Sequence, residues 1–204
     1  LSKKVKLFFK KLLPSILSSG VTQINILVGT IIASFEASAV SYLYYADRIY
    51  QINLAIAGIA VGTVSLPVLS KAFKQKKISN ISNIQSRSIE LSLLLSIPAS
   101  LGLILASKEI VGALFGYGSF AIEDVNMTAY ALKYFGYGVP AFALIKILSN
   151  FFFARNNTKT PFYISTFIVL LNIILSVSFF KAVGFIIIPI ATSISTWVGV
   201  LIYI

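Results

Sequence analysis

An acid and a base stand side by side in the middle of a long apolar run. Asp47 and Arg48 lie within residues 40–66, which are otherwise mostly hydrophobic. A helix of that length crosses a hydrocarbon core of ~30 Å. Both charges would lie roughly 12 Å below its outer end. A charge at that depth costs several kcal/mol unless it faces protein or a wet cavity. Adjacent residues do not face each other on a helix, so each charge needs another partner.

Other polar side chains share the side of this helix that carries the charges. At 3.6 residues per turn, Tyr44 and Gln51 lie on one broad face with Asp47 and Arg48. Small residues that allow close helix packing are expected below them on the same side, namely Gly58, Gly62 and Ser65. We expect the polar half to handle an anionic or polar solute. The alternative is an interhelical ion pair that fixes packing.

Further polar residues lie in apolar runs elsewhere. Lys146 is a second candidate for the solute site, although it could instead extend its ammonium to the inner membrane surface. Ordinary interhelical hydrogen bonds are expected for the uncharged groups, which are Gln23, Asn25, Asn172 and Thr192. The chain has no histidine or cysteine, and its 6 acids are scattered. These residues form no catalytic or metal-binding pattern, so neither an enzyme nor a metal or cofactor site is expected.

The composition indicates an integral membrane protein. Of the 204 residues 57% are hydrophobic and 11% charged, and the mean hydropathy is +0.91. The apolar runs are continuous and not alternating, which favours helices over a β-barrel. The net charge of +11 would suggest nucleic acid in a soluble protein, but here the basic residues flank apolar runs. We therefore expect them to face anionic lipid, with no nucleic-acid partner.

The runs predict one all-α transmembrane domain, residues 1–204. We expect the second helix to end at Pro67 and a Ser/Asn-rich linker to follow up to Arg87. An interfacial helix and loop are expected over 107–126, and a helix break is expected near residues 138–140. Six membrane spans are expected, at about residues 12–35, 40–66, 89–106, 127–153, 162–180 and 185–204.

Basic residues gather in alternate loops. Residues 3–11 and 71–87 each carry five, and residues 155–159 carry two. The opposite loops hold most of the acids. By the positive-inside rule both ends of the chain are expected on the cytoplasmic side. The first residue is not methionine and the last lies in an apolar run, so we expect a fragment of a longer protein.

Several motifs together resemble one family. They are Gly20-Val-x-Gln23-Ile-Asn25, Tyr44-Tyr-Ala-Asp-Arg48, Gly58-x-Ala-x-Gly62-Thr, Leu66-Pro-x-Leu-Ser70, Leu114-Phe-x-Tyr-Gly118, Phe152-Phe-Ala-Arg155 with Lys159-Thr-Pro161, and Ala191-Thr-Ser193. Their order and spacing resemble the lipid II flippase family called MurJ or MviN, over nearly the whole chain.

The resemblance implies one part of a two-lobed, 14-helix flippase fold in the multidrug/oligosaccharidyl-lipid/polysaccharide exporter superfamily. The six spans would be helices seven to twelve, and the first lobe is missing from this sequence. The family is thought to move lipid II, the undecaprenyl-pyrophosphate-linked peptidoglycan precursor, across the bacterial inner membrane by alternating access. The motif arginine lines the cavity in the family, which implies that Arg48 contacts the pyrophosphate, next to Asp47.

Some family members also have a sodium site. Its asparagine and threonine match Asn172 and Thr192, but the aspartates correspond to Gly29 and Ser176. This difference argues against sodium coordination here, and membrane potential or a proton could drive transport instead. A related exporter of polysaccharide-lipid or drugs, and a membrane remnant that transports nothing, are the alternative functions.

Overall fold

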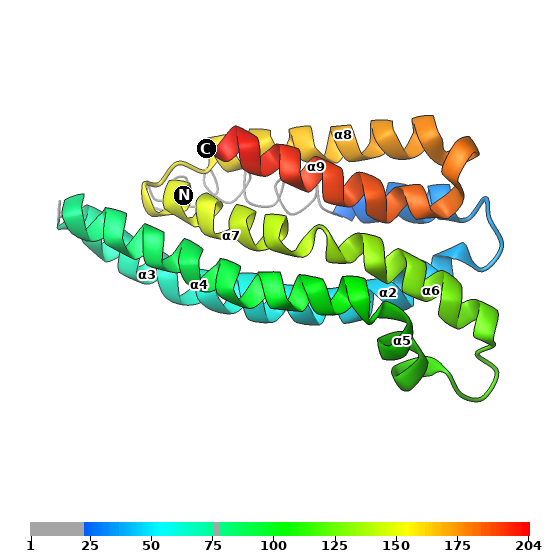
Figure 1. Cartoon of the computed structure of the whole chain (residues 1–204). Coiled ribbons are helices and arrows are strands. Elements are labelled where there is room, and N and C mark those ends of the chain that lie inside the picture. The colour runs from blue at the N-terminus through cyan, green and yellow to red at the C-terminus, as the bar shows by residue number, and fades with distance from the viewer. Residues whose placement is uncertain (1–22, 76–77) are drawn as a thin grey trace, which may run out of the picture.

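A computed structural model describes residues 23–75 and 78–204, and this part of the chain is built from helices (Figure 1). The first described helix is Gln23–Ala33. The others are α2 (Ala39–Leu54), the π turn η1 (Ala55–Ala60), α3 (Val61–Lys74), α4 (Ile78–Leu105), α5 (Ser107–Phe115), α6 (Ile122–Gly136), α7 (Val139–Ala154), α8 (Lys159–Val183), the 3-10 turn η2 (Gly184–Ile186) and α9 (Ile187–Tyr203).

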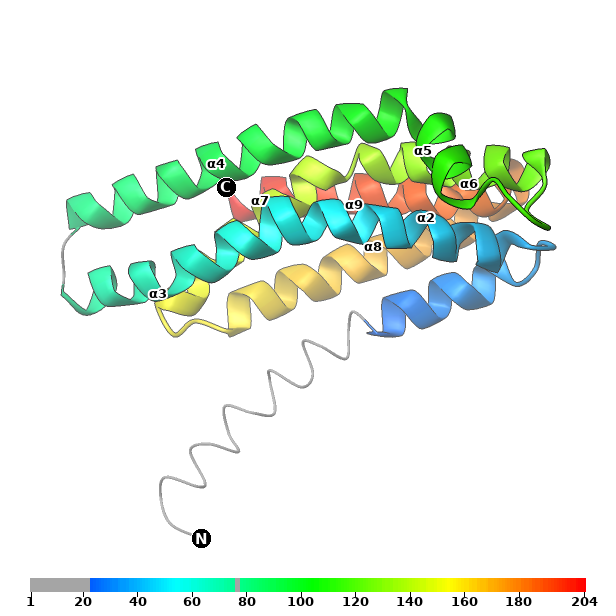
Figure 2. The same ribbon diagram turned by 90° about the horizontal axis from the view of Figure 1, so that it is seen from below.

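The long helices lie roughly parallel in an elongated bundle, while α5 projects at one end (Figures 1 and 2). Three stretches are long and apolar enough to cross a membrane: Ala39–Lys74, Asn80–Leu105 and Lys159–Tyr203. The third folds back on itself at η2, so that α8 and α9 lie side by side (Figure 1). The all-α membrane fold expected from the sequence is confirmed.

The expected break in the fourth span is also confirmed. Helices α6 and α7 together are long and apolar enough for a broken span or a re-entrant loop, and they are bent by 42° at residues 137–138. Pro140 lies in the first turn of α7, where a missing N–H is tolerated. The break leaves backbone carbonyls without their usual helical donors, so other groups must satisfy them.

Two expected boundaries are wrong. The Ser/Asn-rich stretch before Arg87 is not a linker, because α4 begins at Ile78 and runs through it. Serine and asparagine only mildly disfavour a helix, and packing against α3 outweighs that preference. The helix of the second span does not end at Pro67, since α3 continues to Lys74. A proline removes one helical hydrogen bond and crowds the carbonyl four residues earlier, but packing of the flanking residues Ser65 and Leu69 keeps the helix going. Residues 12–22 of the first expected span lie outside the described residues, and Gln23–Ala33 of the rest form a helix.

One end of the bundle is held together by polar contacts between distant segments. The Tyr42 hydroxyl donates to Asp124 at 2.9 Å, which joins α2 to α6. The Phe185 N–H donates to the Glu36 carboxylate at 2.7 Å, which joins the loop before α2 to η2. The backbone of Gly184 has φ +72°, and an added Cβ would lie 2.9 Å from that carboxylate, so this position requires glycine.

Candidate functional site

The polar face of α2, which we define as Tyr44, Asp47, Arg48 and Gln51, lies on the surface of the bundle. Asp47 is half-buried and the other three are exposed. The Arg48 guanidinium donates to the Tyr44 hydroxyl at 2.9 Å and lies 4.6 Å from the centre of that ring. The Gln51 amide donates to the Asp47 carboxylate. In the described part of the chain, each charge therefore has a hydrogen-bond partner other than its neighbour, as expected of adjacent residues, and both partners lie on the same helix.

The buried side of this span does not follow one straight α-helix. Residues about 18 apart on a straight α-helix share a side, because 18 residues make five whole turns. Ala46 is 0% exposed, yet Val64 is 70% exposed. Tyr50 is 3% exposed, yet Val68 is 46% exposed. The packed side therefore changes between the two halves.

The π turn Ala55–Ala60 explains the change. Ser65 and Leu69, each one residue later than the straight-helix equivalents, are 4% and 0% exposed. A π turn holds an extra residue, which rotates α2 against α3 by about 100°. The expectation that Gly58, Gly62 and Ser65 continue the polar face is therefore wrong. They continue the buried side of α2 instead.

In the π turn and below it, the span packs closely on α7. A Cβ added at Gly58 would lie 3.3 Å from the Ala143 Cα, and one at Gly62 would lie 3.2 Å from the Lys146 Cγ. Asn150, 4% exposed, donates to the Gly62 carbonyl at 2.7 Å. Lys146 thus packs its aliphatic part on the small residues while the residue as a whole stays exposed. No described contact joins it to the polar face, about 15–20 Å farther along the span.

The residues that match the sodium site of some family members do come together. Asn172 donates to the Thr192 hydroxyl at 2.8 Å, and the Ser176 hydroxyl lies 3.4 Å from the Asn172 carbonyl oxygen. A Cβ added at Gly29 would lie 3.7 Å from Ile188, one turn before Thr192. These four positions contain no carboxylate, and their polar groups bind one another. Asn172 and Thr192 join α8 to α9 by their hydrogen bond, and Gly29 contributes no polar side chain.

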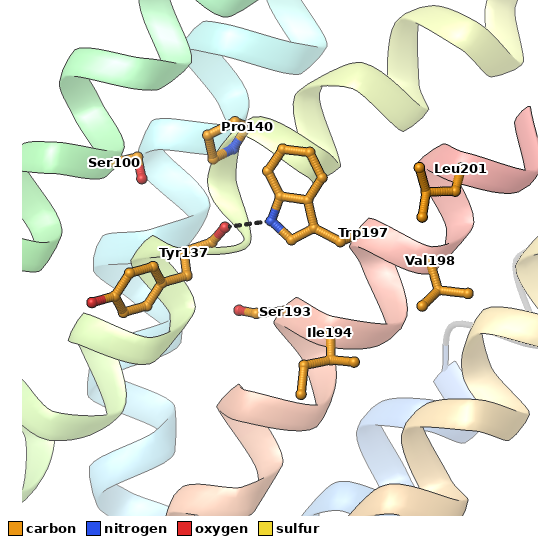
Figure 3. Close-up of a pocket in the computed structure, with 8 residues that line it drawn as sticks. All are labelled: Ser100, Tyr137, Pro140, Ser193, Ile194, Trp197, Val198 and Leu201. Atoms are coloured by element: carbon orange, nitrogen blue, oxygen red, sulfur yellow. Dashed lines mark hydrogen bonds between the residues drawn. The ribbon is translucent and has the colours of Figure 1, made fainter. Parts of the chain in front are cut away.

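Sequence reasoning missed a group of side chains at the α6–α7 break. Ser193 donates to the Tyr134 carbonyl at 2.6 Å, Ser100 to the Gly136 carbonyl at 2.8 Å, and Trp197 to the Tyr137 carbonyl at 2.9 Å. These donors come from α4 and α9, and they satisfy the carbonyls that the break exposes. Figure 3 shows them around a shallow pocket, lined by Ser100, Tyr137, Pro140, Ser193, Ile194, Trp197, Val198 and Leu201.

The polar face presents one cation, one carboxylate, one amide and one phenol to the surface of the bundle. Among the described residues no group of three or more His, Cys, Asp or Glu side chains could hold a metal ion. The exposed guanidinium offers a planar set of donors suited to phosphate. The neighbouring amide and carboxylate offer a donor and an acceptor.

The described helices define an integral membrane protein. A solved outward-facing multidrug resistance MATE family transporter of the MOP superfamily is similar at TM-score 0.80 and 18% identity, covering 94% of this chain and 42% of its own. At that identity the likeness shows the fold alone. The family model described as "Lipid II flippase MurJ" matches residues 1–204, and the chain belongs to this family.

Individual relatives agree with this assignment. The "Probable lipid II flippase MurJ" of Rhizobium meliloti (strain 1021) is 40% identical over 201 residues, which are 98% of this chain and 38% of that protein. A solved structure of "Lipid II flippase MurJ, inward closed conformation" is 32% identical, with TM-score 0.84 over 98% of this chain and 41% of its own. The chain therefore spans about two fifths of the length of these relatives.

Proposed function

We propose that this chain forms part of a transporter that moves lipid II across the bacterial inner membrane. The family supports the proposal, and one observation carries it. The Arg48 guanidinium is exposed on a membrane-spanning helix, and both of its described contacts go to the neutral Tyr44. A positive charge in that position needs an anion or a wet cavity. A pyrophosphate supplies the anion, and alternating access supplies the cavity.

Each polar side chain has a distinct role in this proposal. Arg48 binds the pyrophosphate through two parallel N–H···O bonds, which lysine could not reproduce. Asp47, oriented by Gln51, accepts hydrogen bonds from hydroxyl or amide groups of the head group. Lys146 on α7 adds positive charge farther along the cavity wall.

The rest of a longer polypeptide completes the transporter. Its other lobe covers the polar face and closes the cavity around the lipid-linked precursor. Both ends of the present chain lie on the cytoplasmic side, because the loops richest in lysine and arginine are on the same side of the membrane as these ends. Membrane potential or a proton drives the cycle, because the residues at the sodium-site positions lack a carboxylate.

The test replaces Arg48 in the natural polypeptide that carries this chain. Arg48→Ala should leave the amount of protein in the membrane unchanged and abolish delivery of precursor to the outer leaflet. Arg48→Lys keeps the charge without the planar donor set and should transport at a reduced rate. Exposed Lys181→Ala, at the end of α8, is the matched control and should transport normally. Normal transport by Arg48→Ala would contradict the proposal.

A further inference from the structure

The π turn Ala55–Ala60 separates two halves of one span that have different tasks. Helix α2 carries the polar face, and α3 packs through Gly62 against α7. Because the turn holds one extra residue, it rotates the two halves against each other by about 100°. The turn therefore decides which way the polar face points relative to the packed bundle.

Two side chains from neighbouring helices bind carbonyls in and just after this turn. Ser92 on α4 is 0% exposed, and its hydroxyl donates to the Ala57 carbonyl at 3.0 Å. Asn150 on α7 donates to the Gly62 carbonyl at 2.7 Å. Hydrogen bonding within a π turn departs from the α pattern, and outside donors can satisfy carbonyls that the regular ladder would otherwise bind. The Ala57 carbonyl lies inside the turn, so Ser92 favours the irregular form of the span. The Gly62 carbonyl lies in α3, so Asn150 fastens α3 to α7.

Relaxation of the turn would move the polar face. If the segment became regular α-helix while α3 stayed packed, α2 would rotate by one residue position. The positions 18 residues before the buried Ser65 and Leu69 are Asp47 and Gln51, so these two would turn inward. Ala46 would turn outward. A regular helix is therefore incompatible with an exposed polar face and a packed glycine face at the same time.

We propose that Ser92 is a positioning residue that holds Ala55–Ala60 in the π turn, while Asn150 keeps α3 fixed on α7, and that the turn so aims the polar face away from the packed interior. The consequence for transport rests on the proposed function. The rotation of α2 does not depend on the proposed function, and it can be measured separately.

A one-residue deletion separates positioning from simple packing. Ile56 lies in the turn with its side chain 55% exposed, so its removal costs little core contact. Without it, a regular α-helix holds both halves at their present relative rotation. Ser92 then has no turn to hold. Ser92→Ala should consequently change the parent protein and leave the deletion variant unchanged, whereas a hydroxyl that only stabilises packing would matter in both.

The readout is the reactivity of single thiols. This chain contains no cysteine, so Gln51→Cys and Ala46→Cys can be labelled with a water-soluble maleimide in membranes, in a cysteine-free form of the natural polypeptide. The first thiol should react and the second should be protected. Ser92→Ala should lower the ratio of the two rates by roughly fivefold, the equilibrium effect of one neutral hydrogen bond, and deletion of Ile56 should restore it.

Ser88→Ala is the matched control, because Ser88 is also buried on α4 but donates to the Ile84 carbonyl of its own helix. It should leave the ratio unchanged. An unchanged ratio in Ser92→Ala, or an equal fall with and without the deletion, would overturn the positioning role. If the labelling ratio falls in Ser92→Ala and is restored by the deletion, but Arg48→Ala transports normally, the positioning role stands and only the proposed function is contradicted.

Discussion

Gly138→Ala tests how tightly α9 is fitted to the α6–α7 break. The Gly138 backbone has φ −85°, which alanine adopts without strain, so only the available space matters. An added Cβ would lie 2.8 Å from the Ser193 hydroxyl, and 3.3 Å from both the Ser193 Cα and the Phe135 carbonyl oxygen, so the hydroxyl is the closest obstacle. The methyl group fits only if that hydroxyl leaves the Tyr134 carbonyl, which it binds at 2.6 Å. We expect a loss of about 1–3 kcal/mol in the free energy of unfolding, the cost of an unsatisfied buried carbonyl.

Ser193→Ala provides the test of this reasoning. Alone it should cost a similar amount, because the same carbonyl loses its donor. In the double variant the methyl group meets no hydroxyl, so the combined loss should be smaller than the sum of the single losses by about 1 kcal/mol. Unfolding in detergent can be followed by the fluorescence of Trp197, the single tryptophan of this chain, whose indole donates to the Tyr137 carbonyl.

Gly102→Ala is the matched control. A Cβ at Gly102 in α4 would meet nothing within 4 Å, and alanine is the better helix former. That variant should unfold at the same free energy as the parent or up to about 1 kcal/mol higher. Strict additivity of Gly138→Ala and Ser193→Ala, or a neutral Gly138→Ala, would refute the account of the break.

Two further predictions concern the ends of the bundle. Glu36→Ala leaves the Phe185 N–H without its acceptor and should lower the free energy of unfolding by about 1–3 kcal/mol. The control Glu109→Ala, at an exposed residue, should change it by less than about 0.5 kcal/mol. Equal effects of the two variants in a denaturation series would contradict this prediction. For membrane orientation, an impermeant thiol reagent added outside intact cells should label Ser38→Cys and not Lys74→Cys, and the reverse pattern would show that the orientation is inverted.

Much of the helical framework could be predicted from the length of the apolar runs. The break near Pro140 could be predicted as well, because glycine and proline together interrupt a helix regardless of its neighbours. The helix before Arg87 could not be predicted, since a Ser/Asn-rich sequence is compatible with both a linker and a helix. Packing of α4 against α3 favours the helix. Pro67 was misinterpreted for the same reason: the chain on both sides of it remains packed.

The polar face itself could be predicted, but its relation to the glycine face could not. The residues Ala55-Ile-Ala-Gly-Ile-Ala60 are compatible with a regular helix, and their types do not predict a π turn. The donor Ser92 belongs to a series with a spacing of four that is visible in the sequence, namely Ser88, Ser92, Ser96 and Ser100. The acceptors of Ser92 and Ser100 are carbonyls exposed by irregularities in other helices, so only the folded structure pairs them.

The central claim is that Arg48 binds the pyrophosphate of a lipid-linked precursor. The most direct measurement is the affinity of the purified natural polypeptide for undecaprenyl pyrophosphate and for undecaprenol, which has the same chain without the phosphates. The parent should prefer the pyrophosphate, and Arg48→Ala should lose most of that preference while its affinity for undecaprenol stays the same. An undiminished preference in Arg48→Ala would contradict the claim.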